Sequence, residues 1–440
     1  MTTTEVPGPR GLPVIGNTHQ WARDPCSFRE SCARKYGHVV NYEMLGWDTY
    51  MLTDPDDIKR VLEDRETFPK HEDGNSELEE IVGEGLLTSE GDLWERQREA
   101  IQPAFYMNHI KNYAESMVDQ AAATGGRWSD SEQIDVRRSM TRCTLDILVD
   151  CMFGEEIDPG ARGLYEAVEA FQEPLKPSRQ PITFFAPDWA PVPFLRRADR
   201  AKAHIDEQVY DILDERCEQR AEGNDDRDDL LAMLLDADTE MGDEQIHDEM
   251  LTFLFAGHET TALSLTYIWH LLSANPDAEA RLHDELDELL DGKPGIEDVF
   301  AFEYTEAVVK EAMRLFPPAH EIRRSPAEDV EIGGYTIPEG CLITLPAWVL
   351  HRDDRFWDDP EQFRPERFLE DSDRPEYAYF PFGGGPRRCI GQQFAMTEAQ
   401  LVLATLARDW TLKREYDDLE LAASVTLQPK NDVTMTPHRR

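Results

Sequence analysis

Apolar side chains recur at helical spacing along most of this 440-residue chain. Intervals of three and four residues place apolar side chains on one face of a helix, which has 3.6 residues per turn. The pattern predicts helices over residues 94–124, 138–154, 199–220, 244–274, 277–291, 304–315 and 392–408. The chain is therefore predicted to be mainly α, with a smaller β portion.

Two stretches predict β-structure instead. Residues 38–53 have the composition of a β-hairpin that turns near Gly46. Residues 328–346 predict a second β-region, with Gly333-Gly334 at its first turn. No linker, repeat or low-complexity segment interrupts the chain, so we expect a single domain over residues 1–440.

The apolar segment 250–272 is long enough to suggest a membrane span. Its centre, however, carries His258, Glu259, Thr260 and Thr261. An ionisable cluster at the middle of a bilayer is costly. The segment therefore predicts a buried central helix with a polar break at a functional position, and no membrane anchor is expected.

The net charge of −44, from 89 acidic and 45 basic residues, changes the picture of the surface. Nucleic acid is not an expected partner, because phosphate binding needs a basic face. Disorder is not expected either, because 40% of the residues are hydrophobic. A halophilic host is the simplest explanation, since at about 1 M salt the screening length is only ~3 Å.

The cysteines and the N-terminus bear on the compartment. Seven cysteines, an odd number, occur without a CxxC pair or zinc-like spacing: Cys26, Cys32, Cys143, Cys151, Cys217, Cys341 and Cys389. Most are expected to be buried free thiols in a reducing compartment. Glu5 follows directly on Met1–Thr4, so no signal peptide is predicted. We therefore expect a cytoplasmic protein.

One cysteine lies in an unusual segment, FGGGPRRCIG, from Phe382 to Gly391. Its glycines permit a close approach of the backbone. Cys389 stands just before an apolar helix, whose N-terminus stabilises a thiolate, and Arg387 adds positive charge. From the residues alone, both a buried structural cysteine and a functional thiolate remain open.

The spacing Phe382-x-x-Gly385-x-Arg387-x-Cys389-x-Gly391 resembles the ligand loop of the cytochrome P-450 superfamily. The resemblance implies that Cys389 is the axial ligand of the iron in haem b. A thiolate ligand pushes electron density to the iron and favours O–O cleavage. It also implies that Phe382 packs beside the thiolate and that the haem lies between the central helix and the helix after Cys389.

The central helix carries AGHETT, from Ala256 to Thr261, which resembles the oxygen-activation motif of the family. The resemblance implies that Ala256 and Gly257 let haem and O₂ approach, that Thr260 hydrogen-bonds the oxygen, and that Glu259 relays protons. A zinc HExxH site is excluded because Ala262 stands where the second histidine is needed. A polar break without chemistry remains the alternative.

Two further segments suggest a charged triad. Glu311 and Arg314 have the spacing of the family's ExxR, which places them on one helix face. Such pairs are commonly solvated surface contacts. Arg367 lies in PERF, which also resembles the family. The resemblance implies that these three residues form a buried structural triad.

Arginines are also expected at the haem propionates. Trp94 and Arg98 resemble a propionate-binding pair of the family, in which arginine offers two parallel hydrogen bonds to a carboxylate. Arg387 matches another propionate arginine. Arg324 matches a third, and its neighbour Arg323 is the rival.

The activity implied is that of a haem-dependent monooxygenase, which inserts one atom of O₂ into an apolar organic substrate. The segment CIGQQFA is most similar to the bacterial fatty-acid-hydroxylase branch. Asp48, in the first hairpin, nevertheless disfavours an anionic head group. The apolar pocket is expected near Phe253 and Ala256, after Pro318, and around residues 66–87.

Electrons are expected from a separate ferredoxin or flavodoxin-type donor with its reductase, because no nucleotide-binding fingerprint occurs before the chain ends at Arg440. A monomer is expected. A peroxygenase or isomerase would commonly lack the pair Glu259-Thr260, and a haem-based gas sensor or carrier would not need it. The pair therefore favours oxygen activation.

Overall fold

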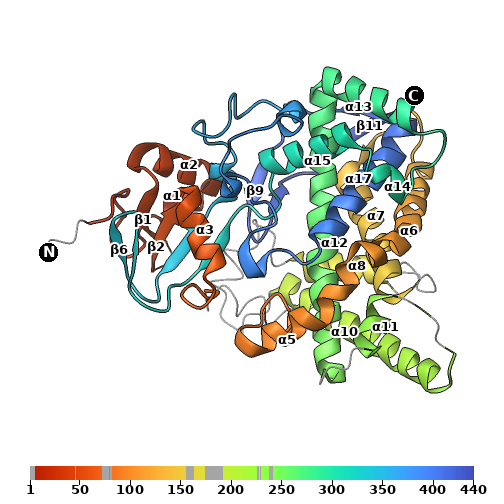
Figure 1. Cartoon of the computed structure of the whole chain (residues 1–440), viewed down its shortest axis with the longest axis horizontal. Coiled ribbons are helices and arrows are strands. Elements are labelled where there is room, and N and C mark those ends of the chain that lie inside the picture. Colours follow the sequence, from red (N-terminus) through yellow and green to blue (C-terminus); the bar gives the residue numbers. More distant parts are fainter. Residues whose placement is uncertain are drawn as a thin grey trace. The chain divides into compact units, whose positions relative to one another are not determined.

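The computed structural model describes residues 5–44, 46–71, 79, 82–154, 163–173, 192–224, 227, 229–236 and 241–440. They form two compact units (Figure 1). Unit 1 comes from residues 1–76, 307–392 and 421–428, and unit 2 from residues 77–306, 393–420 and 429–440. Each unit combines three separate segments, so no single cut in the chain divides them. That the chain forms one domain stays a prediction.

Unit 1 is built on a four-stranded sheet in the order β1-β2-β7-β4. Its strands are β1 (Val39–Met44), β2 (Trp47–Leu52), β4 (Ile322–Arg324) and β7 (Leu342–Leu345). β1 and β2 pair antiparallel with Met44 opposite Trp47, which confirms the predicted hairpin. β7 joins β2 in parallel and β4 joins β7 antiparallel. β5 (Val330–Ile332) and β6 (Tyr335–Ile337) pair around Gly333-Gly334, as predicted.

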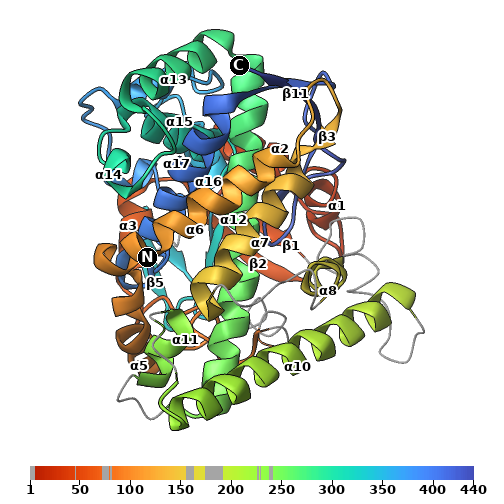
Figure 2. The same ribbon diagram turned by 90° about the vertical axis from the view of Figure 1, so that its right-hand side faces the viewer.

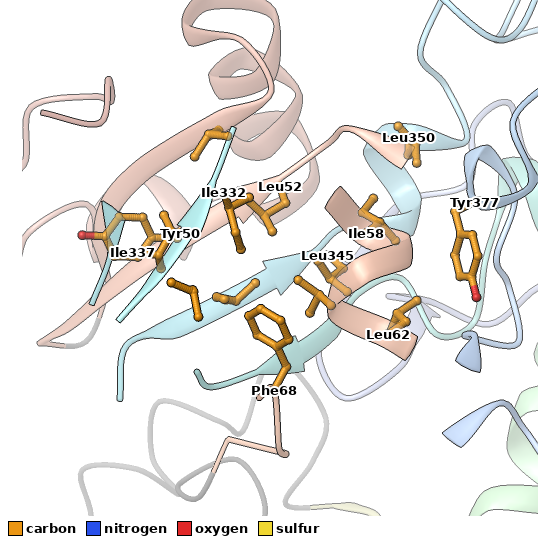
Figure 3. Packing of buried hydrophobic residues seen from close by; sticks show 14 of the residues in the cluster. Tyr50, Leu52, Ile58, Leu62, Phe68, Ile332, Ile337, Leu345, Leu350 and Tyr377 are labelled. Atoms are coloured by element: carbon orange, nitrogen blue, oxygen red, sulfur yellow. The ribbon is translucent and has the colours of Figure 1, made fainter. Parts of the chain in front are cut away.

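The two faces of this sheet have separate apolar clusters, because successive side chains of a strand point to opposite faces. On one face, here called the α3 face, Leu52 and Leu345 pack with Ile58 of α3 (Pro55–Glu63), as Figure 3 shows. On the other, here called the α2 face, Met51 and Leu342 pack with Cys32 of α2 (Pro25–Tyr36). The sheet is therefore covered on both sides.

Short elements complete unit 1. They are α1 (Thr18–Trp21), α16 (Ala347–Leu350), the 3₁₀ turns η3 (Pro365–Phe368), η4 (Glu376–Ala378) and η5 (Gly385–Arg387), and strands β9 (Leu421–Ala423) and β10 (Leu427–Pro429). α15 (Glu303–Leu315) contributes its residues from Ala307 onward to this unit.

Unit 2 is largely helical. Its helices are α5 (Gly91–Ile101), α6 (Met107–Gly126), α7 (Val136–Phe153), α8 (Leu164–Phe171), α10 (Pro193–Ala221), α11 (Leu230–Asp236), α12 (Asp243–Ala274), α13 (Pro276–Leu289), α14 (Ile296–Val299) and α17 (Gln392–Asp409). β3 (Ile134–Asp135), β11 (Thr434–Arg439) and β8 (Trp410–Arg414) form a small sheet in that order. Figure 2 shows α7 beside the long helix α12, against which it packs.

The predicted long helices recur with one correction. The expected helix over 94–124 is interrupted, because Pro103 lies in a 3₁₀ turn, η1 (Gln102–Phe105), that separates α5 from α6. Proline has no backbone N–H and restricts the residue before it, which explains the break. The pattern also failed to predict the short helices α2, α3, α8 and α11.

The central helix has the predicted character. α12 runs from Asp243 to Ala274, and most of its side chains are buried in protein. Among the residues that the structure describes, no helix combines the length and the apolar character that crossing a membrane needs.

Candidate active site

The loop before Cys389 is closed by its own backbone. The N–H of Cys389 donates to the carbonyl oxygen of Phe382 at 2.9 Å, and that of Gly383 donates to Phe380 at 3.0 Å. Gly385 has a φ of 63°, and a Cβ at this position would lie 2.1 Å from the carbonyl oxygen of Leu62 in α3. Only glycine fits this close approach. The loop therefore lies directly against the end of α3.

Cys389 itself is exposed, whereas most of the other cysteines are buried. Burial raises the pKa of Cys26, Cys143 and Cys341 to about 12, so these thiols are poor metal ligands. Cys217 is the other exposed cysteine, but it lies within helix α10. Cys389 therefore does not have the burial that is expected of a structural cysteine, and its role as a ligand stays a prediction.

The structure brings the three predicted triad residues together in unit 1. Arg314 donates to Glu311 through Nε at 2.7 Å and Nη2 at 2.9 Å, and Arg367 donates through Nε at 3.0 Å. Glu311 and Arg314 have no exposed surface, and Arg367 is 5% exposed. The triad is therefore a buried network and not a surface pair.

The triad is connected to the cysteine loop by hydrogen bonds. Arg314 Nη1 donates to the carbonyl oxygen of His351 at 2.6 Å, and Nε2 of His351 accepts from the N–H of Phe380 at 3.0 Å. Burial holds the pKa of His351 well below its usual range, so the ring is neutral and can accept. Phe380 in turn accepts from Gly383. The triad thus fixes the start of the loop that carries Cys389.

The pairing of β4 separates Arg324 from its rival Arg323. Arg323 lies opposite Thr344 of β7, on the α2 face, and donates to Glu321 at 2.7 and 3.0 Å. Arg324 lies opposite Ile343, on the α3 face, and is 8% exposed. The two arginines therefore point to opposite faces of the sheet.

The cysteine loop lies on the same face as Arg324. Ile322 alternates with Arg323 and shares the face of Arg324, and a Cβ on Gly383 would lie 3.3 Å from Cδ1 of Ile322. Arg387, in η5, is half-buried. Unit 1 therefore places Arg324 on the sheet face that the cysteine loop approaches.

Helix α12 of unit 2 is open at one place along its buried length. Between Glu249 and Leu272, all its side chains are buried except those of Ala256, Gly257, Glu259 and Thr260. These are the predicted oxygen-activation residues. Within this stretch of α12, accessible surface is therefore confined to the level of these four small or polar residues.

The side facing α7 is closed at the same level. A Cβ on Gly257 would lie 3.1 Å from a methyl carbon of Leu148, and the hydroxyl of Thr144 donates to the carbonyl oxygen of His258 at 2.9 Å. The missing side chain at Gly257 is thus explained by helix packing, and its predicted role toward haem stays a prediction. Burial lowers the pKa of His258 to about 4, so its ring is neutral, and Nδ1–H donates to Leu254 at 2.6 Å.

The hydroxyl of Thr260 donates to the carbonyl oxygen of Ala256 at 2.9 Å. Its proton is therefore engaged, while its oxygen still has lone pairs that can accept a hydrogen bond. In α5, Trp94 is buried and Arg98 is half-buried, and their spacing of four residues puts them on one helix face.

The comparisons with known proteins agree with these features. The family model described as Cytochrome P450 matches residues 6–435. The chain belongs to the cytochrome P450 family. It is 34% identical to cyclooctatin synthase of Streptomyces melanosporofaciens over 419 residues, which cover 92% of this chain and 89% of that protein. As a member of this family, the chain is a monooxygenase that uses haem b as its cofactor.

Two other relatives have equally broad coverage. Cyclooctat-9-en-7-ol 5-monooxygenase of S. melanosporofaciens is 34% identical over 426 residues, which cover 94% of this chain and 90% of that protein. Pentalenene oxygenase of Streptomyces avermitilis is 32% identical over 433 residues, which cover 96% of this chain and 95% of that protein.

The residues present in this P450 fit haem b. Unit 1 supplies an exposed thiol in a fixed loop, with Arg324 on the same side of the sheet. Unit 2 supplies a helix that is open at Ala256, Gly257 and Thr260. Taken by itself, unit 1 has the sulfur and guanidinium groups that suit an iron and propionates. Taken by itself, unit 2 has small residues that leave room for a flat ring.

Part of the expected substrate pocket falls outside the described residues. The segment 66–87 includes 72–78, 80 and 81, which the structure does not describe. Phe253 is buried, and its ring centroid lies 5.4 Å from that of Phe105.

Sequence reasoning missed a buried acid in α17. Glu398 is 2% exposed, and burial raises its pKa to about 8, although a hydrogen bond with Thr261 opposes the shift. The group is therefore largely protonated at neutral pH. A single acid among apolar residues at helical spacing, in AMTEAQLVL, was the signal that could have revealed it.

Substitution of the triad carboxylate tests its structural weight. Glu311→Gln leaves two buried guanidinium groups without their charged partner, so the free energy of unfolding should fall by ~3–5 kcal/mol. Denaturant unfolding of the holoprotein measures this. The control is Glu420→Gln, which breaks an exposed pair with Lys430 at 3.9 Å and should cost about 1 kcal/mol or less. Equal costs for the two variants would contradict the network.

Proposed function

We propose that Cys389 is the axial ligand of the haem in this P450 monooxygenase. The observation that carries the proposal is that Cys389 combines an exposed thiol with a backbone-closed loop of the family's spacing. When bound, haem supplies the iron at which O₂ is activated. The protein's part is to hold the sulfur in position. Because the loop is closed by its own backbone hydrogen bonds, the sulfur has little conformational freedom to lose when haem binds.

The arginines and small residues complete the cofactor assignment. We assign Arg98 with Trp94, Arg324 and Arg387 to the propionates, since arginine can donate two parallel hydrogen bonds to a carboxylate. We also assign Phe382, whose carbonyl oxygen accepts from the N–H of Cys389, to a position beside the thiolate. The argument for Arg324 over Arg323 is that the register of β4 puts Arg324 on the α3 face, where Ile322 lies beside Gly383 of the cysteine loop, and Arg323 on the opposite face.

We assign proton delivery to Glu259 and Thr260. Between Glu249 and Leu272 they are the two residues of α12 that are both partly exposed and polar, and a carboxyl and a hydroxyl group can pass on a proton. The hydroxyl of Thr260 donates to the carbonyl oxygen of Ala256, which fixes its orientation. Its oxygen can then accept a hydrogen bond from a group that carries a proton. Ala256 and Gly257 leave room beside it.

We propose that the substrate is a bulky apolar hydrocarbon or its alcohol. The names of two relatives, cyclooctat-9-en-7-ol 5-monooxygenase and pentalenene oxygenase, support this class. The exposed Asp48 of the first hairpin argues against a fatty acid, although CIGQQFA resembles the fatty-acid-hydroxylase branch. Coulomb repulsion disfavours a carboxylate head group near Asp48.

A salt-rich host and a ferredoxin or flavodoxin-type donor remain proposals, as do a monomeric state and a cytoplasmic location. The host is argued from the net charge of −44, whose self-repulsion salt would screen. Stability that falls between about 0.1 M and about 2 M KCl would speak against it.

The ligand is tested by the ferrous-CO spectrum. Cys389→Ala should lose the strongly red-shifted Soret band that thiolate ligation gives. Cys217→Ala, which removes the other exposed cysteine, should retain that band. A red-shifted band in Cys389→Ala would refute the assignment.

The proton-delivery role is tested by the coupling of reductant to product. In Thr260→Ala, reductant consumption should continue while hydrogen peroxide replaces product, and product per reductant should fall by about tenfold or more, since positioned proton transfer contributes ~10²–10⁴-fold. Thr266→Ala is the matched control, because Thr266 makes the same type of bond, to Ala262 at 2.6 Å, in the buried part of α12. Unchanged coupling in Thr260→Ala would exclude the role.

The substrate class is tested by binding spectra of the ferric protein. Pentalenene and cyclooctat-9-en-7-ol should shift the Soret band at micromolar concentration, whereas palmitate should bind more weakly. Asp48→Asn removes the repulsion and should strengthen palmitate binding specifically. Tight palmitate binding by the unmodified protein would reverse the proposed preference.

A further inference from the structure

Unit 1 contains a second buried charge cluster, centred on Glu321 just before β4. The Glu321 side chain is 5% exposed and forms an ion pair with Arg29 of α2, which is 1% exposed. It also accepts from Arg323 through Nε at 3.0 Å and Nη2 at 2.7 Å. None of these residues belongs to the triad of Glu311, so the cluster is a separate network.

The cluster keeps its charges despite burial. Burial alone would raise the pKa of Glu321, but Arg29, and then Arg323, hold it well below its usual range. Burial alone would lower the pKa of Arg29, but Glu321 raises it above its usual range. His320 is also buried, and burial lowers its pKa to about 4, so it is neutral. A buried charge without its partner strongly destabilises the folded protein. Arg29 and Glu321 must therefore stay in contact, which restricts where the start of β4 can lie relative to α2.

The cluster lies on the opposite face of the sheet from the cysteine loop. Arg323 pairs across β7 with Thr344, on the α2 face. Ile322 and Arg324 point to the α3 face, where Ile322 lies beside Gly383 of the cysteine loop. The pairing of β4 with β7 therefore decides which arginine lies on the side of Cys389, and contacts at the start of β4 help to hold that pairing in place.

We propose that Glu321 is a positioning residue for the cofactor. By holding Arg323 on the α2 face and anchoring the start of β4 to Arg29, it keeps Arg324 on the side of the cysteine loop, where Arg324 binds a haem propionate. This inference rests on the proposed assignment of Arg324. It assigns to Glu321 and Arg29 a role that acts through another residue and not by contact with haem.

The experiment measures haem transfer from the holoenzyme to excess apomyoglobin. Glu321→Gln should accelerate haem loss by about tenfold, the value of one charge-assisted hydrogen bond to a propionate. Arg324→Ala should accelerate it at least as much. In the double variant, Glu321→Gln should add no further acceleration, because Arg324 is no longer present to be misplaced.

The control is a buried ion pair of matched exposure in unit 2. Arg216 and Asp229 lie 2.8 Å apart with side chains 2% and 5% exposed. Asp229→Asn should lower the unfolding midpoint without changing haem transfer. If Glu321→Gln yields no haem-loaded protein, Glu321→Asp and Arg29→Lys keep the charges while altering the geometry, and their accelerations should likewise vanish in the Arg324→Ala background.

The outcomes separate the possible failures. Equal acceleration by Glu321→Gln with and without Arg324 would mean general destabilisation, and it would overturn the positioning role. No effect of Arg324→Ala would overturn the assignment of Arg324 and the inference with it. The ferrous-CO band of each variant reports on Cys389 independently, so a retained band leaves the proposed ligand standing in either case.

Discussion

A carboxylate with no exposed surface determines much of unit 1. Glu311 must be surrounded by donors, because a buried charge without partners costs several kcal/mol. Two of its donors come from Arg314 in the same helix, and others come from Arg367 and the backbone N–H of Arg364, about fifty residues later. The need of Glu311 for donors therefore holds the segment with Arg364 and Arg367 against α15.

The same requirement extends to the loop of Cys389. Arg314 has more N–H groups than Glu311 can accept, and one of them donates to His351. His351 is neutral and accepts from Phe380, so its ring transmits the position of the triad to the loop. In our assignment the sulfur of Cys389 is a metal ligand, and such a ligand must be held to within a fraction of an ångström. Here that precision derives from a network that touches neither the sulfur nor, in our assignment, the cofactor.

The sequence predicted the elements whose signals are periodic or densely spaced. Apolar periodicity predicted α12 and its neighbours, glycine turns predicted the β1–β2 hairpin, and the spacing of Glu311 and Arg314 predicted one helix face. It missed the break at Pro103, because the apolar period continues through the proline. It also missed Glu398, although the apolar residues around this acid, at helical spacing, were a local signal of its burial.

The adjacent residues Arg323 and Arg324 show why the sequence alone does not determine which side chain of a strand faces a site. From the sequence, Arg323 and Arg324 could not be distinguished, because a shift of one residue in register exchanges the two faces of a strand. The pairing of β4 with β7 separates them, and that pairing depends on residues that lie far apart along the chain.

At the contact of α7 with α12, the side chain of Leu148 fills the space that a side chain at position 257 would need. A methyl group added at Gly257 would lie 3.1 Å from Leu148, closer than packed carbon atoms normally lie. During evolution or engineering, these two positions can therefore change only in opposite directions. A larger residue in α12 requires a smaller one in α7. The shape of α12 at Ala256–Thr261, which we assign to oxygen activation, therefore depends on α7 as well.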